Sequence, residues 1–127
     1  MQNAALYNKG MKTRRAVLGQ QRENERMNEE DEFSMPIREF TTKYVWGEVW
    51  SRKGLPIKIR CLVNIALLTA MKCPSELKSH VRGAILNGCS KTEIREVLLQ
   101  CATCCGVPAM RDALRTARQV FAEMKKK

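Results

Sequence analysis

The residues best suited to chemistry in this chain surround its one histidine, His80. Glu76 lies four residues earlier, in the stretch PSELKSHVRG, and this spacing places both side chains on one face of a helix. A carboxylate placed there can hold one ring nitrogen, set the tautomer and leave the other nitrogen for proton transfer. The alternative is a structural histidine that is satisfied inside a helical core, because His80 falls in an apolar stripe.

Two cysteine patterns could indicate redox or metal chemistry. Cys101 and Cys104 form a C-x-x-C pair, but it ends a predicted helix, where the helix dipole disfavours a thiolate. No second Cys or His pair lies at a usual zinc spacing, so we expect packing rather than a metal site. Cys73 precedes His80 by seven residues, about 10 Å along a helix axis, which is too far for direct thiol–imidazole contact. A thiol-dependent peroxidase acting through Cys73, or through Cys101 and Cys104, stays as an alternative.

A second group of candidates precedes the longest apolar run. Trp46 and Trp50 form an i,i+4 pair that could wall a pocket, and Glu48 between them is either a pocket acid or an ordinary exposed one. Arg60 leads directly into buried sequence, a setting that suits an arginine binding a carboxylate, and Arg52 is the second choice.

The charge of the chain limits its partners. The net charge of +10 favours either a small anionic ligand or nucleic acid. Arg111, Arg115 and Arg118 line one face of the last predicted helix, so a non-catalytic basic binding protein is a further alternative. No recognition motif accompanies them, and we expect no nucleic-acid partner. The longest apolar run is too short for a membrane span, and an N-terminus without an apolar signal core predicts a cytoplasmic protein with free thiols.

Hydrophobic periodicity predicts an all-α, single-domain bundle of about six helices and no strand. The first helix covers residues 3–18, and the acidic segment of about residues 20–33 is predicted to be a solvated linker. Pro36 and Pro56 each open a helix, and the second of these is apolar on nearly every side, as in a helix at the centre of a domain or against another subunit. Pro74 opens the helix of His80. A capping box, Ser90 to Glu93, opens the next, and the last begins near Pro108.

The runs WGEVW, ELKSHVRGAILNG and EIREVLLQ, followed by CGVPA, resemble the gamma-carboxymuconolactone decarboxylase family over roughly residues 6–125. The resemblance implies an alkylhydroperoxidase-D-like helical fold, assembled from intertwined subunits into a trimer or hexamer. It also implies cofactor-free loss of CO2 from 4-carboxymuconolactone, a dicarboxylate lactone of the protocatechuate (3-oxoadipate) pathway. The peroxidase branch of this superfamily carries C-x-x-C-x-x-x-H. That frame reads Cys73, Glu76, His80 here, so the second thiol is missing, which argues against peroxide chemistry.

The chemistry implied by this resemblance needs no metal or pyridoxal, because the conjugated lactone carbonyl accepts the electrons left by CO2. The protein must orient a carboxylate, stabilise the developing oxyanion and supply one proton. We expect His80, held by Glu76, to give the proton and Arg60 or Arg52 to bind a carboxylate.

Overall fold

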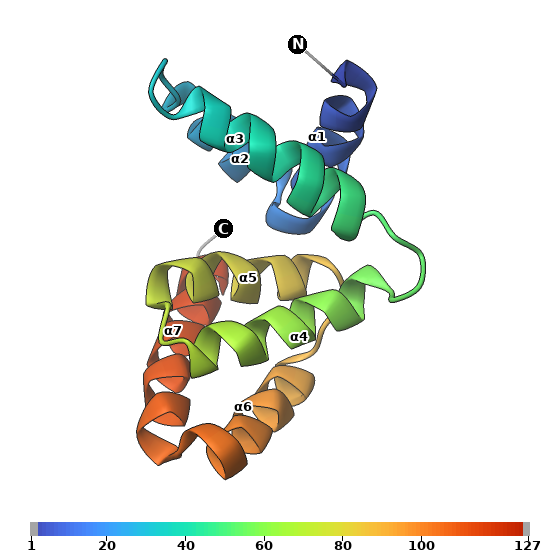
Figure 1. Ribbon diagram of the computed structural model, residues 1–127. Helices are drawn as coiled ribbons and strands as arrows, with labels where there is room; N and C mark the ends of the chain where they lie inside the picture. Colours follow the sequence, from blue (N-terminus) through green and yellow to red (C-terminus); the bar gives the residue numbers. More distant parts are fainter. Residues whose placement is uncertain (1–2, 126–127) are drawn as a thin grey trace. The chain divides into compact units, whose positions relative to one another are not determined.

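The computed structural model describes residues 3–125, and every regular element in that range is a helix (Figure 1). The all-α prediction is therefore confirmed. The chain divides between Ile57 and Lys58 into two compact units. No helix within the described residues is long and apolar enough to cross a membrane. The elements are α1 (Ala4–Leu18), α2 (Gln20–Asn28), α3 (Met35–Phe40), the π-helix η1 (Thr41–Val49), α4 (Ile57–Ala70), α5 (Pro74–Leu86), α6 (Lys91–Cys105) and α7 (Val107–Lys125).

The first unit is built on a close crossing of α1 and η1, where each helix contributes a glycine. A Cβ added to Gly10 would lie 1.8 Å from the carbonyl oxygen of Thr42, and one added to Gly47 would lie 2.9 Å from the carbonyl oxygen of Leu6. Side chains at these two positions would therefore force the backbones apart. A glycine inside a helix usually weakens it, but here the packing of α1 against η1 requires Gly10.

The acidic segment differs from its prediction. Residues 20–28 form α2 where we expected a solvated linker, and Glu23 on this helix is fully buried. Its carboxylate lies 3.0 Å from Nε of Arg14 and also contacts the guanidinium of Arg38. Burial lowers the pKa of Arg14, whereas the hydrogen bond and charge of Glu23 outweigh burial at Arg38 and raise its pKa. Glu23 therefore joins α2 to Arg14 on α1 and to Arg38 on α3.

The second unit is built on α7, which packs against both α5 and α6. Small residues Ala109, Ala113 and Ala117 of α7 are buried, so neighbouring helices can approach closely. Glu123 of α7 also binds Lys78 at 2.7 Å and Arg82 at 2.8 Å, both on α5. The capping box at Ser90 that was predicted for α6 is confirmed.

Several apolar residues with helical spacing are exposed. Leu114 on α7 is 37% exposed, and Ile37 and Phe40 on α3 are more than half exposed. On α4 only one face is buried, through Cys61, Ile65 and Thr69. The opposite face exposes Ile59, Val63 and Leu67. Association of copies of the chain stays a prediction.

Replacing Glu23 by glutamine should destabilise the protein by about 3–5 kcal/mol, because Arg14 would lose its carboxylate partner and buried Arg38 would keep only Glu30, at 3.7 Å. Chemical denaturation with circular dichroism measures the change. Glu25 lies on the same helix and is exposed, so Glu25→Gln is the matched control and should change stability by less than about 0.5 kcal/mol. Equal stabilities for the two variants would contradict the role given to Glu23.

Gly10→Ala should destabilise the protein by at least about 1–3 kcal/mol, because the added methyl group meets backbone rather than a movable side chain. Gly54→Ala is the control, since an added Cβ there has no heavy atom within 4 Å. A Gly10→Ala protein with the thermal midpoint of the parent would show that α1 and η1 do not need this close contact.

Candidate active site

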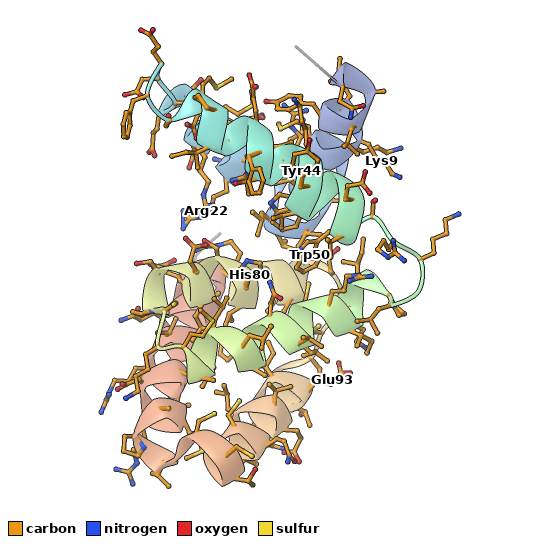
Figure 2. All side chains as sticks on the ribbon, in the orientation of Figure 1. Lys9, Arg22, Tyr44, Trp50, His80 and Glu93 are labelled. Carbon is orange, nitrogen blue, oxygen red and sulfur yellow. The ribbon has the colours of Figure 1, made fainter. Side chains whose placement is uncertain are left out.

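His80 lies in the middle of α5 and is buried, with 7% of its surface exposed (labelled in Figure 2). Pro74 and the acidic Glu76 start this helix, and its buried face carries Leu77, Val81 and Ala84 beside the histidine. The predicted apolar stripe is thus confirmed, and it gives the imidazole a largely dry environment. In such an environment charges and hydrogen bonds act more strongly than in water.

The ring is contacted from α4. Nδ1 of His80 lies 3.4 Å from the side-chain amide nitrogen of Asn64, which is half-buried. In this arrangement the amide nitrogen can donate to Nδ1 in the ring tautomer that carries its proton on Nε2. Sequence reasoning did not assign Asn64 to the site. Its signal was an amide side chain inside the apolar run from Cys61 to Met71, where Thr69 is the other polar residue.

Arg60 precedes Asn64 by four residues on α4, so both side chains leave the helix on the same face. Arg60 is half-buried. The second unit therefore offers a cation, an amide and an imidazole on two of its helices. Such a set can bind a carboxylate, orient a ring and move a proton.

Glu76, predicted to hold the histidine, lies in the first turn of α5 with an exposed side chain. The contact described above instead comes from Asn64 of another helix. The role of Glu76 stays a prediction.

The second unit contains a cavity of about 330 Å³, whose lining includes neither Asn64 nor His80. It includes Leu68, four residues after Asn64, and Leu77, three residues before His80. One helical turn therefore separates the cavity from the Asn64–His80 contact on both helices. The cavity is largely apolar and carries two cationic side chains, from Lys72 and Arg115, beside one carboxylate, that of Asp112.

The remaining predicted site residues belong to the first unit. Trp46 and Trp50 are buried and stacked, with ring centroids 4.8 Å apart, which confirms the predicted pair. They lie on the π-helix and at its end, where the backbone N–H of Trp50 donates to the carbonyl of Val45. Glu48 and Arg52 are exposed. Their roles in a site stay predictions.

The six cysteines are free thiols, and burial favours the protonated form of the buried Cys61 and Cys101. Burial, with a smaller effect of Cys89, raises the pKa of Cys61 to about 12. Burial also raises the pKa of Cys101, the first residue of the C-x-x-C pair. A protonated thiol is a poor nucleophile, so these features weigh against thiol chemistry at Cys101. Within residues 3–125, no group of three or more His, Cys, Asp or Glu side chains is placed to hold a metal ion.

Comparison of the sequence with known proteins places the chain in a family. The sequence model of the carboxymuconolactone decarboxylase family matches residues 36–119. A 4-carboxymuconolactone decarboxylase from Acinetobacter baylyi is 36% identical over 98% of this chain and 92% of its own length. A nitrosuccinic acid decarboxylase from Metarhizium robertsii is 36% identical over 94% of this chain and 83% of its own length. An uncharacterized 15.0 kDa protein from Paracoccus denitrificans is 38% identical over 61% of this chain and 60% of its own length. The chain therefore belongs to the carboxymuconolactone decarboxylase family.

Proposed function

We propose that the protein is a cofactor-independent decarboxylase that removes CO2 from 4-carboxymuconolactone, with His80 as the proton donor. The observation that carries this proposal is a single buried imidazole, contacted by Asn64, in a chain aligned over nearly its whole length with a decarboxylase. The relatives' names support the substrate class. Carboxymuconolactone and nitrosuccinic acid both carry two carboxyl groups and an electron-accepting group, a conjugated lactone carbonyl in one and a nitro group in the other.

The reaction divides into two steps. The bond between carbon and the departing carboxylate breaks, and its electron pair moves into the conjugated lactone to give a dienolate. The dienolate then takes one proton at carbon. Arg60 orients a substrate carboxylate by a charge-assisted hydrogen bond, with Arg52 as the second choice. No oxidant or reductant is needed, because the electron pair of the broken bond stays in the dienolate until the dienolate is protonated.

His80 must be in its charged form to give a proton and remain neutral afterwards. In that form Nδ1 carries a hydrogen, so the Asn64 amide turns and its oxygen becomes the acceptor. Asparagine can serve both ring states because its side chain has a donor and an acceptor end. A substrate with two negative charges favours the charged ring on binding.

His80→Ala should lower kcat on 4-carboxymuconolactone by about 10²–10⁴-fold, the usual contribution of a positioned proton donor. Release of CO2 and the ultraviolet absorbance of the lactone measure turnover, and far-ultraviolet circular dichroism checks that the helices persist. Near-normal turnover by a folded His80→Ala protein would exclude the proposed role. Absence of turnover in the parent chain, with nitrosuccinic acid accepted instead, would move the substrate assignment within the family.

Asn64→Leu should lower kcat by about tenfold or more with a smaller change in KM, because Asn64 orients the ring rather than binding substrate. Asn64→Gln, which keeps both amide functions, should recover part of the loss. Leu67→Gln is the control, since Leu67 lies on the same helix with an exposed side chain. A parallel rise in KM at unchanged kcat would instead indicate a substrate-binding role for Asn64.

A further inference from the structure

The first unit contains a pocket of about 620 Å³, lined in part by Trp50 and by Arg52, the second choice for the substrate carboxylate. It lies between α1 and the segment that follows η1, and two of its residues, Lys9 and Trp50, are labelled in Figure 2. Trp50 provides aromatic surface, and Thr13 and Ser51 add hydroxyl groups. All the lining residues belong to this one unit, so the pocket does not depend on the rest of the chain.

Four cationic side chains line the pocket, from Lys9, Lys12, Arg52 and Lys53. None of its lining residues is acidic. Among the residues that the structure describes, Lys9, Lys12 and Lys53 have no salt-bridge partner, whereas Lys58 and Lys78 in the other unit are paired with glutamates. Like charges gathered at a concave surface repel one another and attract an anion from solution.

The glycine contacts described above explain why this arrangement is held together. Lys9 and Lys12 flank Gly10 and Met11 on α1, and Lys12 lies three residues after Lys9, so both leave the helix on one side. The contact of Gly10 with the backbone of η1 fixes α1 against the helix that ends at Trp50. The close contact between the backbones of α1 and η1 therefore keeps these cations together.

We propose that this pocket is a binding site for a small organic polyanion, carboxylate- or phosphate-bearing, whose body lies against the indole of Trp50. The cations supply most of the attraction, and the hydroxyl groups of Thr13 and Ser51 add polar partners. A compact dianion meets lysines from α1 and basic side chains from the segment after η1 at the same time. Sequence reasoning found Trp50 and Arg52 as substrate-binding candidates, but the three lysines join them only in the folded unit. The pocket shares Arg52 with the proposed decarboxylation, but anion binding can be measured without turnover and is therefore tested separately.

Nuclear magnetic resonance of the two indole N–H groups tests the proposal on the full chain. Succinate and inorganic phosphate, titrated separately at low salt, should shift the Trp50 signal saturably with at least one of the two probes. The probe that binds more tightly assigns the carboxylate or the phosphate chemistry. Added sodium chloride should weaken the binding, since exposed charges are screened.

The double variant Lys12→Gln/Lys53→Gln should raise the Kd by about tenfold, which corresponds to about 1.4 kcal/mol. Arg111→Gln/Arg118→Gln removes two exposed charges of α7 outside the pocket and is the matched control, with less than about a twofold change expected. The proposal is overturned if neither probe shifts Trp50 saturably, or if the two double variants weaken binding equally. Turnover by the same variants is a separate readout, so failure of this site and failure of the decarboxylase assignment are distinguishable.

Discussion

An imidazole can deliver a proton to one carbon atom only if its ring is held in one orientation, and the proposed role of His80 depends on that constraint. His80 lies on the buried face of α5, which packs against α7, and Asn64 reaches it from α4. The salt bridges of Glu123 with Lys78 and Arg82 secure α5 to α7 from the solvent side. Helix packing and the contact with the Asn64 amide thus position the imidazole on which the proposed reaction depends.

In the first unit, buried ion pairs hold the helices together. A buried carboxylate, Glu23, binds Arg14 and Arg38 and so joins α2 to α1 and α3. Removal of one partner of such a cluster leaves an uncompensated buried charge, which lowers the stability of the fold. The glycine contact between α1 and η1 then brings the basic side chains around Trp50. In the proposed anion site these cations attract the ligand through their number and shared sign, whereas the proposed role of His80 depends on the orientation of one ring.

The parts of this structure that sequence could predict are those set by local rules. Pro74, Gly106 and the Ser90 capping box mark helix ends through backbone chemistry alone, and the apolar stripe of α5 predicted that His80 is buried. Contacts between distant segments could not be predicted in this way. The burial of Glu23 depends on Arg38, fifteen residues away. Asn64 reaches His80 across sixteen residues, and no local pattern in the sequence indicated this contact.

The central claim is that a fixed group of the protein, and not water, gives the proton to the carbon of the dienolate. Turnover of 4-carboxymuconolactone in D2O tests this most directly, with the configuration of the new CHD centre in the enol-lactone product read before the solvent exchanges it. We predict one deuterium delivered to a single face of the ring. Equal labelling of both faces by the parent protein would contradict the account, because it would mean that the intermediate takes its proton from free solvent.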